Sequence, residues 1–270
     1  MKKKIGFIGA GNMAGALIKG LLETKRYRAR DLWASDADGR QLARLRRAYK
    51  IEGTRDNQAL VENSAVVVLA VKPQIMDVVL EQVRGFVTRR HLFVSIAAGI
   101  TLARLKAGLG PDAKLVRSMP NTPSLVGTGM TVLVRGGRAT LADERLATAL
   151  FGGVGDVVRV KDEKLMDAVT GLSGSGPAFV YRFAEGLIAG AVAAGLPPAT
   201  ASRLTFQTIA GAAKMLQETG RSPEELRVMV SSPGGTTLAG LKALDDCDLV
   251  PAVGGAVRAA TRRSRELGRG

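Results

Sequence analysis

The 270-residue chain contains one cysteine, Cys247, and one histidine, His91. A single cysteine cannot form an internal disulfide, so the sequence favours a reducing, cytoplasmic location. Aromatic residues make up only 4% of the chain against a hydrophobic content of 46%, which predicts a folded protein with a core of Ala, Val and Leu. No cluster of Cys and His typical of a metal site is present, and we expect no bound metal.

Uninterrupted apolar stretches are also few. Lysines at the N-terminus resemble the start of a signal peptide, but three glycines interrupt the apolar stretch that follows, which indicates a strand. The apolar segment 177–194 carries Arg182 and Glu185, and these charges argue against a membrane span. We therefore expect no membrane partner. No internal repeat or low-complexity segment is present.

Positive charge is in excess, with a formal net charge of +15. The basic residues are spread along the chain without interleaved aromatic residues, so a solvated surface that attracts anionic ligands is favoured over a nucleic-acid interface. No nucleic-acid partner is expected, although a nucleotide-binding regulator or a nucleic-acid-binding protein on the same fold is an alternative that this charge supports.

The pattern Gly9-x-Gly11-x-x-Ala14 follows a short apolar run and precedes a segment with helical spacing. This strand–turn–helix context is that of a dinucleotide fingerprint. Gly9 would make the turn, Gly11 would let a pyrophosphate approach the backbone, and Ala14 would let the helix pack closely. The alternative is an ordinary strand-to-helix turn of an α/β protein.

Further strands are expected from apolar runs that end in small or polar residues. With the first strand they alternate with helices, which predicts an α/β protein: an N-terminal Rossmann-type doubly wound sheet over residues 1–160. Beyond residue 160 every segment has a helical pattern, which predicts an all-helical domain over residues 161–270. The expected strands after the first lie at 31–36, 64–71, 91–99, 114–118, 130–134 and 157–160.

Asp36 stands at the end of the second expected strand. An acid there typically accepts from the ribose hydroxyls of the adenosine, which favours NADH over NADPH. Two alternatives remain: Asp36 could be an N-cap for the helix that begins near Gly39, and Arg40 could meet a 2′-phosphate. Lys72 is expected to contact ribose or phosphate rather than to act as a base, and His91, at the start of a strand, is expected to be a surface residue.

In the helical half, the helix 177–194 is apolar on nearly every side. A small domain cannot surround such a helix, so we infer burial against a partner subunit. The next helix, 198–218, is amphipathic. The stretch 231–237 contains serines, glycines and threonines around one proline and leads into another helix. This turn favours a carboxylate-binding site, and the alternative is that its hydroxyls only cap the helix.

Together these stretches resemble pyrroline-5-carboxylate reductase, the last enzyme of proline biosynthesis. The matching segments occur in the family's order along the whole chain, and the last two are the most specific. They are Ile8-Gly9-Ala10-Gly11-Asn12-Met13, Ala70-Val71-Lys72-Pro73-Gln74, Ser95-Ile96-Ala97-Ala98-Gly99, Arg117-Ser118-Met119-Pro120-Asn121-Thr122-Pro123, Gly171-Leu172-Ser173-Gly174-Ser175-Gly176-Pro177-Ala178 and Ser231-Ser232-Pro233-Gly234-Gly235-Thr236-Thr237.

The resemblance implies a homodimer with interleaved helical domains, with a decamer of dimers as a larger assembly. It also implies a substrate, 1-pyrroline-5-carboxylate, that is reduced to L-proline by hydride from NADPH or NADH. Asp36-Ala37 departs from the family's usual Ser or Asn and leans toward NADH. The implied substrate-binding residues are Ser232, Gly234, Gly235 and Thr237, with Thr237 as the catalytic residue near the ring nitrogen. The cofactor-binding residues are Ile8, Gly9, Ala10, Gly11, Asn12, Met13, Ser35, Asp36, Asn57, Ala70, Val71, Lys72, Pro73, Ala97, Ala98 and Gly99.

This reaction suits a chain that has only one histidine and one cysteine. A protonated cyclic imine is already electrophilic, so the enzyme mainly has to align two carbon atoms. The enzyme alternative, a 3-hydroxyacid-type dehydrogenase, needs a proton-transfer group, usually a lysine on the first long helix of the helical domain. The helix from Pro177 offers no lysine.

Overall fold

The computed structural model of the protein describes residues 3–268. Contacts divide the chain into two compact units, one of residues 3–175 with 259–268 and the other of residues 176–258. The sequence placed the division between residues 160 and 161. The first unit extends further because Met166, in α7 (Met166–Val169), is fully buried against Val132 and Val134.

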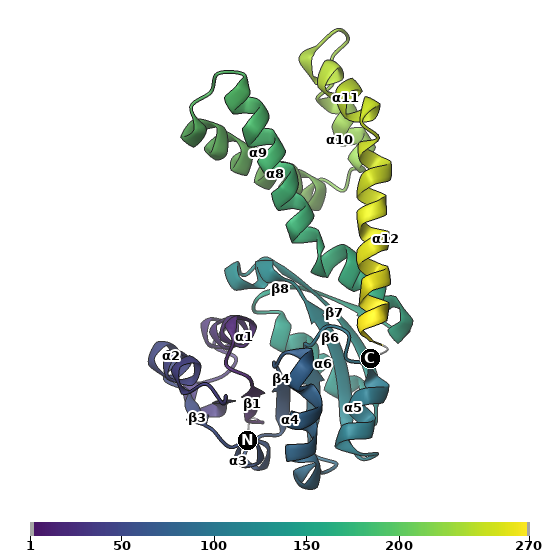
Figure 1. Cartoon of the computed structure of the whole chain (residues 1–270). Coiled ribbons are helices and arrows are strands. Elements are labelled where there is room, and N and C mark those ends of the chain that lie inside the picture. The colour runs from purple at the N-terminus through teal and green to yellow at the C-terminus, as the bar shows by residue number, and fades with distance from the viewer. Residues whose placement is uncertain (1–2, 269–270) are drawn as a thin grey trace. The chain divides into compact units, whose positions relative to one another are not determined.

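The first unit is built on one sheet of eight strands (Figure 1). The strands alternate with helices over most of their length, as the sequence predicted. They are β1 (Ile5–Ile8), β2 (Leu32–Ser35), β3 (Glu52–Thr54), β4 (Val66–Leu69), β5 (Leu92–Ser95), β6 (Lys114–Pro120), β7 (Gly129–Gly137) and β8 (Gly155–Val160).

The strand order is β3-β2-β1-β4-β5-β6-β7-β8, with β1 to β6 parallel. β7 runs antiparallel to β6, and β8 is parallel to β7. The chain passes from β1 outward to β2 and β3 and then returns to the other side of β1 with β4. This reversal is the topological switch point at which doubly wound sheets bind ligands. The predicted fold class, a Rossmann-type sheet followed by a helical domain, is confirmed.

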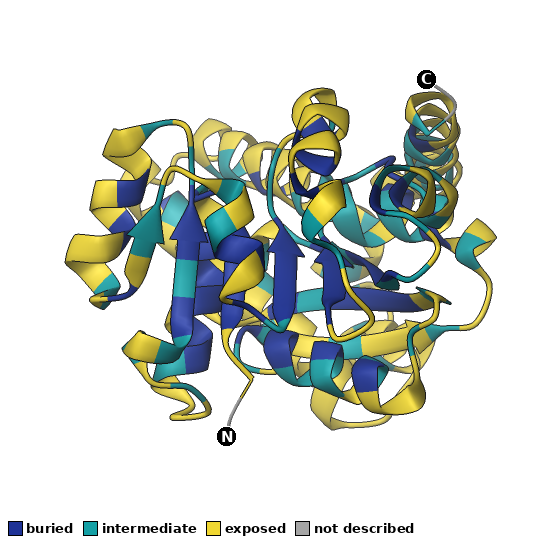
Figure 2. Ribbon diagram, turned by 90° about the horizontal axis from the view of Figure 1, so that it is seen from below, coloured by how far each residue is buried: buried dark blue, intermediate teal, exposed yellow. Residues whose placement is uncertain are grey.

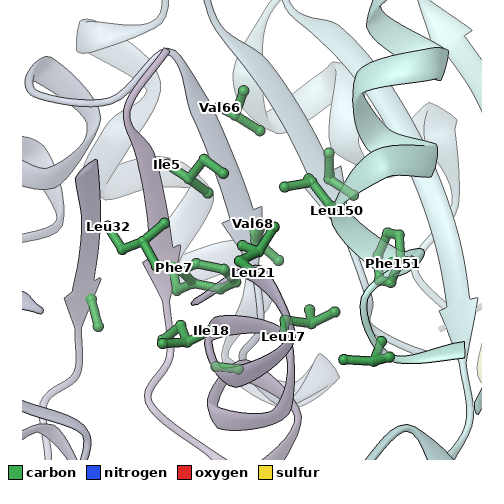
Figure 3. Close-up of a cluster of buried hydrophobic side chains, with 14 of the residues drawn as sticks. Ile5, Phe7, Leu17, Ile18, Leu21, Leu32, Val66, Val68, Leu150 and Phe151 are labelled. Atoms are coloured by element: carbon green, nitrogen blue, oxygen red, sulfur yellow. The ribbon is translucent and has the colours of Figure 1, made fainter. Parts of the chain in front are cut away.

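Helices cover both faces of the sheet and bury its side chains in two clusters. On one face α1 (Asn12–Glu23), α2 (Gly39–Tyr49) and α6 (Leu141–Phe151) pack on β1, β2 and β4, as Figure 3 shows for α1. Phe7 and Phe151 are fully buried in this cluster, and each such side chain contributes roughly 1.5–3 kcal/mol through removal of its apolar surface from water.

The other face is covered by α3 (Asn57–Glu62), α4 (Met76–Val83) and α5 (Leu102–Leu109). Because helices lie on both faces, all four residues of β4 are buried, which explains its uninterrupted apolar sequence. The central strands β1, β4 and β5 are buried throughout and dark blue in Figure 2, while the outward faces of the surrounding helices are yellow.

The second unit consists of helices. They are α8 (Gly176–Ala193), α9 (Pro198–Glu218), α10 (Pro223–Met229), α11 (Thr236–Asp246) and the first part of α12 (Leu249–Leu267). The bounds predicted for α9 match those observed, and α8 begins and ends one residue before its predicted bounds. Among the described residues no helix is long and apolar enough to cross a membrane.

Two expectations need correction or completion. His91 is fully buried, so its prediction as a surface residue was wrong. The ring lies edge-on to Phe93, with the centroids 6.2 Å apart, and its Nδ1 accepts from the amide of Thr88 over 3.0 Å. These contacts hold the ring of His91 in place directly before the start of β5. The edge strand β3 was not predicted, because three residues containing one acid and one glycine show no strand pattern.

Candidate active site

The ends of four parallel strands lie side by side. Ile8 pairs with Ser35 on one side and with Leu69 on the other, and Leu69 pairs with Ser95. We call this row of strand ends the carboxyl edge. The register therefore brings together the turns after β1, β2, β4 and β5, which carry nearly all the residues predicted to bind the cofactor.

The turn after β1 is shaped by Gly9, whose φ is +105°. A Cβ at Gly9 would lie 2.5 Å from the carbonyl oxygen of Ala70, so only glycine fits between the two chains. Gly11 is the N-cap of α1 and provides no side-chain cap, and a Cβ there would meet nothing within 4 Å. The start of α1 is therefore open beside Gly11 and carries no side-chain cap, as an anion site at a helix start requires.

The carboxylate of Asp36 is tied to this turn. Its Oδ2 accepts from the amide of Ala10 over 2.7 Å, and its Oδ1 accepts from the amide of Asp38 over 2.8 Å. Asp38, not Asp36, caps α2, because its side chain accepts from the amide of Arg40. Since a carboxylate has about four acceptor positions, Asp36 retains capacity for a ligand hydroxyl.

A chain of side-chain hydrogen bonds extends from the end of β2. The hydroxyl of Ser35 donates to Oδ1 of Asn57 over 2.6 Å, and Nδ2 of Asn57 donates to Oε1 of Gln82 over 2.7 Å. β2, α3 and α4 are thereby connected at the carboxyl edge. The structure thus places Asn57 directly beside Ser35, as expected if both serve one ligand, and adds Gln82, which the sequence reasoning missed.

Two arginines beside the same turns were also missed. Arg44 donates to the carbonyl of Ala10 over 3.2 Å, and Arg55 donates to the carbonyl of Ala37 over 3.1 Å. Arg44 follows Arg40 by one helical turn, and this i, i+4 spacing was the available signal. Arg55 precedes α3 with no comparable pattern. Both bring positive charge close to the position of Asp36.

The turns after β4 and β5 complete the carboxyl edge. The amide of Ala70 donates to the carbonyl of Ile8 over 2.8 Å, which holds the turn after β4 against the glycine-rich turn. Lys72 is exposed and precedes the short helix Pro73–Ile75. After β5, the amide of Ala97 donates to Oγ of Ser95, and Gly99 adopts a φ of +75°. Ala98 lies between them.

Two of the family-like segments meet inside the first unit. Nδ2 of Asn121 donates to the carbonyl of Ser173 over 3.2 Å, and its Oδ1 accepts from the amide of Met130 over 2.8 Å. A Cβ at Gly174 would lie 2.6 Å from the side chain of Met119. The sequence assigned these segments no role. The contacts show that they position the chain between β6 and β7 against the turn that precedes α8.

A buried ion pair stands beyond the end of β5. Arg117 of β6 pairs in register with Ser95, and its guanidinium lies 2.8 Å from Oε1 of Glu163. The same oxygen accepts from the amide of Leu102, at the start of α5, over 2.7 Å. The side chain of Arg117 is only 6% exposed. This contact joins residues 46 positions apart, and no local pattern indicated it.

The predicted substrate turn lies in the second unit, between α10 and α11. The amide of Gly235 donates to the carbonyl of Ser232 over 3.0 Å, and Gly234 has a φ of +70°. A Cβ at Gly235 would lie 2.4 Å from Oγ of Ser232. Gly235 is the N-cap of α11, and no side chain caps the helix. The alternative hypothesis was that the serine and threonine hydroxyls of the turn only cap this helix. The structure does not support it, because no side chain caps α11.

No metal centre is found in the described part of either unit. Within residues 3–268 no group of three or more His, Cys, Asp or Glu side chains is arranged to hold an ion. The groups described above are backbone N–H donors, hydroxyls, carboxylates and the cationic side chains of Arg44, Arg55, Lys72 and Arg117.

A doubly wound sheet with a glycine-rich first turn and an all-helical second unit is typical of dinucleotide-dependent oxidoreductases of two units. Comparison with known proteins agrees with this class. The family model "NADP oxidoreductase coenzyme F420-dependent" matches residues 4–99, and the model "Pyrroline-5-carboxylate reductase dimerisation" matches residues 163–267.

Full-length relatives identify the family. The pyrroline-5-carboxylate reductase of Synechocystis sp. is 42% identical over 269 residues, which cover 100% of both chains. The structure of the Coxiella burnetii pyrroline-5-carboxylate reductase superposes with a TM-score of 0.93 at 36% identity, covering 99% of each chain. The Plasmodium falciparum enzyme, solved with NADP bound, gives 0.89 at 30% identity over 99% of this chain and 98% of that one. The chain belongs to the pyrroline-5-carboxylate reductase family.

Proposed function

We propose that the carboxyl edge holds the dinucleotide and that the turn 231–237 holds the substrate carboxylate. Family membership makes the chain an NAD(P)H-dependent oxidoreductase that reduces 1-pyrroline-5-carboxylate to L-proline, the last step of proline biosynthesis. The residue assignments below are our proposal.

The observation that carries the cofactor assignment is the position of Gly9 against Ala70. Contact at 2.5 Å from a Cβ to the Ala70 carbonyl excludes every side chain there, while the space beside Gly11 is open at the start of α1. Backbone approach and free N–H groups are what a pyrophosphate requires. We assign the cofactor to this edge, in contact with Ile8, Gly9, Ala10, Gly11, Asn12, Met13, Ser35, Asp36, Asn57, Ala70, Val71, Lys72, Pro73, Ala97, Ala98 and Gly99.

The identity of the preferred cofactor depends on the charges around Asp36. Its carboxylate, held by Ala10 and Asp38, would accept from ribose hydroxyls and repel a 2′-phosphate. Arg44 and Arg55 stand beside the same turns and would attract that phosphate. We propose a preference for NADH, because Asp36 is positioned by two backbone N–H groups and sits where the ribose is expected.

For the substrate, the start of α11 offers backbone N–H groups without partners inside the helix. Ser232, Gly234 and Gly235 form the turn that would surround a carboxylate, and the φ of +70° at Gly234 favours glycine there. Thr237, in the first turn of α11, would hydrogen-bond the ring nitrogen and so orient the imine.

The reaction needs few further groups from the protein. The protonated cyclic imine is electrophilic, and bound NAD(P)H supplies the hydride, so no protein nucleophile is needed. Two anchors on the substrate, at the carboxylate and at the ring nitrogen, fix the orientation of the ring. Such positioning can account for several kcal/mol of the barrier.

One observation separates this function from that of a 3-hydroxyacid dehydrogenase. α8, the first helix of the second unit, contains no lysine. Its two charged residues, Arg182 and Glu185, pair with each other over 2.7 Å on the exposed side of the helix. α8 therefore provides no lysine for the proton transfer that an alcohol substrate requires.

The dimerisation-type helices indicate a homo-oligomer. We propose that the helical second unit, residues 176–258, interleaves with that of a second copy, and that dimers assemble further into a decamer of dimers. Support comes from α8, in which only Ala184 is buried while Val180, Tyr181 and Phe183 are exposed. A cytoplasmic location is also proposed, since Cys247 cannot form an internal disulfide.

A direct assay tests the function. Purified protein is mixed with 1-pyrroline-5-carboxylate and either NADH or NADPH, and absorbance is followed at the nicotinamide band. We expect loss of reduced nicotinamide with formation of proline in equal amount. Turnover of a 3-hydroxyacid with oxidised cofactor, and none of the imine, would refute the proposal.

A further inference from the structure

A pocket opens at the end of the sheet opposite to the carboxyl edge, among the amino ends of the strands. Its volume is about 1080 Å³, slightly above the usual range of about 300–1,000 Å³ for small-molecule sites. We call it the amino-edge pocket. Its lining residues come from positions before or at the start of β1 to β5. They are Lys3, Lys4, Arg28, Arg30, Asp31, Trp33, Glu52, Glu62, Asn63, Ser64, Ala65 and Arg90.

Two buried polar atoms among the lining residues have no hydrogen-bond partner. They are Nε1 of Trp33 and Oγ of Ser64, and Ser64 is only 3% exposed. Trp33 pairs in register with Gly6, and a Cβ at Gly6 would lie 2.5 Å from Oγ of Ser64. The glycine therefore admits the hydroxyl beside the strand. Each atom has less than 1 Å² of accessible surface, so neither faces the pocket, and a ligand is indicated instead by the exposed charges around it.

The pocket also has an excess of positive charge. Five of its lining residues are cations (Lys3, Lys4, Arg28, Arg30 and Arg90) and three are acids (Asp31, Glu52 and Glu62). In the described part of the chain none of these cations forms an ion pair with a carboxylate. Arg90 donates to the carbonyl of Glu62 over 3.2 Å, and Nζ of Lys4 lies 5.8 Å from the ring centroid of Trp33. Clustered cations without acidic partners favour an anionic ligand.

We propose that the amino-edge pocket binds a small polyphosphate anion. Arg30 and Arg90 contact the phosphate oxygens and neutralise their charge. Arginine suits this role because its planar fork matches phosphate oxygens. The amino and carboxyl edges are opposite ends of the same strands, so this site is separate from the one proposed for the dinucleotide. The inference does not depend on the proposed function.

Trp33 gives the pocket its own reporter, since the chain has one tryptophan. Its fluorescence is recorded at low ionic strength during titration with tripolyphosphate and, separately, with adenosine triphosphate. Both titrations are repeated with NADP⁺ at saturation. We expect a saturable change in emission that persists in the presence of NADP⁺. Equal affinities mean that the phosphate chain alone is recognised, and tighter binding of the nucleotide means that the nucleoside adds contacts.

Three variants test the lining residues. Arg30→Gln and Arg90→Gln each remove one charge that we place at the phosphate and should weaken binding about tenfold. Arg28→Gln removes a third exposed charge of the lining and should weaken it severalfold. Lys106→Gln removes an exposed charge on α5, outside the pocket, and should leave binding unchanged.

Several results would overturn the proposal. One is the absence of any emission change up to millimolar concentrations of both anions. Another is a change that NADP⁺ abolishes, which would place the binding at the carboxyl edge. A third is equal weakening in Lys106→Gln and in the pocket variants, which would indicate general attraction to a basic surface.

Discussion

The amide of Ala10 donates to Oδ2 of Asp36 over 2.7 Å. One hydrogen bond thus joins the glycine-rich turn after β1 to the residue after β2. The carboxylate of Asp36 therefore accepts a hydrogen bond from the backbone of the turn and is also proposed to accept from the ribose. A substitution at Asp36 affects both the turn and the cofactor. The two effects can be separated, because some side chains keep an acceptor for the Ala10 amide and lose only the charge.

The first prediction uses this separation to test cofactor choice. Asp36→Ser removes the negative charge that would repel a 2′-phosphate, and the kcat/KM ratio should shift toward NADPH by about 1–3 kcal/mol. Asp36→Asn keeps an acceptor for the Ala10 amide and removes only the charge, so it should produce the same direction of shift. Steady-state kinetics with both cofactors measure the ratio. An unchanged ratio in both variants would mean that Asp36 acts only on the backbone turn.

The second prediction concerns Thr237. Thr237→Val keeps the shape and removes the hydroxyl, so the ring nitrogen loses its proposed partner. We expect kcat/KM for the imine to fall by about 1–3 kcal/mol, or roughly tenfold to a hundredfold, with NADH affinity retained. Thr236→Val, one position earlier, is the matched control and should stay near wild type. Equal kinetics for all three proteins would remove Thr237 from the catalytic site.

The third prediction tests the turn around Thr237 through its glycines. A Cβ at Gly235 would approach Oγ of Ser232 to 2.4 Å, so Gly235→Val must displace the turn that is proposed to hold the substrate carboxylate. KM for the imine should rise strongly, while NADH binding, measured by nucleotide titration, should be nearly unchanged. Wild-type kcat/KM in this variant would show that the substrate carboxylate is held elsewhere.

The fourth prediction concerns assembly. Phe183 in α8 is 45% exposed within a single chain, and we expect a partner subunit to cover it. Phe183→Glu should weaken the dimer, which light scattering after size-exclusion chromatography would report as a lower mass. Val78→Glu is the control, because Val78 in α4 is 57% exposed in the first unit. A wild-type protein that is a folded, active monomer at low concentration would contradict the expectation.

The fifth prediction follows from His91. Burial, with a smaller effect from the charge of Arg90, lowers the pKa of His91 below its ordinary value. The folded protein therefore keeps the ring neutral while the unfolded chain takes up a proton, so the free energy of unfolding should decrease as pH falls below about 6.5. This contribution is fully present above the ordinary pKa and is lost as pH falls toward the lowered one.

Urea denaturation between pH 5 and pH 8 measures this dependence. His91→Gln removes the titrating ring from a chain that has no other histidine. The variant should be less stable at pH 8, because the ring's packing on Phe93 is lost, and its stability should change less between pH 7 and pH 5. Parallel curves for the two proteins would show that another group sets the slope.

Local patterns in the sequence predicted most of the fold. The four buried residues Val66–Leu69 form an apolar run that only a covered central strand explains, and α9 combines an initial proline with an amphipathic repeat. β3 was missed because the short edge strand Glu52–Thr54 depends on pairing with β2 rather than on its own residues. The burial of His91 depends on neighbours that the sequence does not reveal.

The site was predictable where it follows strand ends. Residues directly after β1, β2, β4 and β5 are placed together by the sheet, so a strand prediction is enough to find them. Arg117 and Glu163 could not be paired in advance, because their contact depends on how far β8 extends. The roles of Asn121 and Ser173 were equally hidden, since each is defined by a partner more than fifty residues away.

The length of β8 determines where Glu163 lies relative to Arg117. Ser95 pairs with Arg117, Arg117 with Val134, and Val134 with Val160, the last residue of β8. These four residues therefore lie in one row across the sheet. Glu163 follows three residues later and reaches Arg117 and the amide at the start of α5. Two residues added to β8 would move that carboxylate by about 6.6 Å along the strand direction, well beyond hydrogen-bond reach. The number of residues in a surface strand is thus as constrained as the identity of a residue in the core.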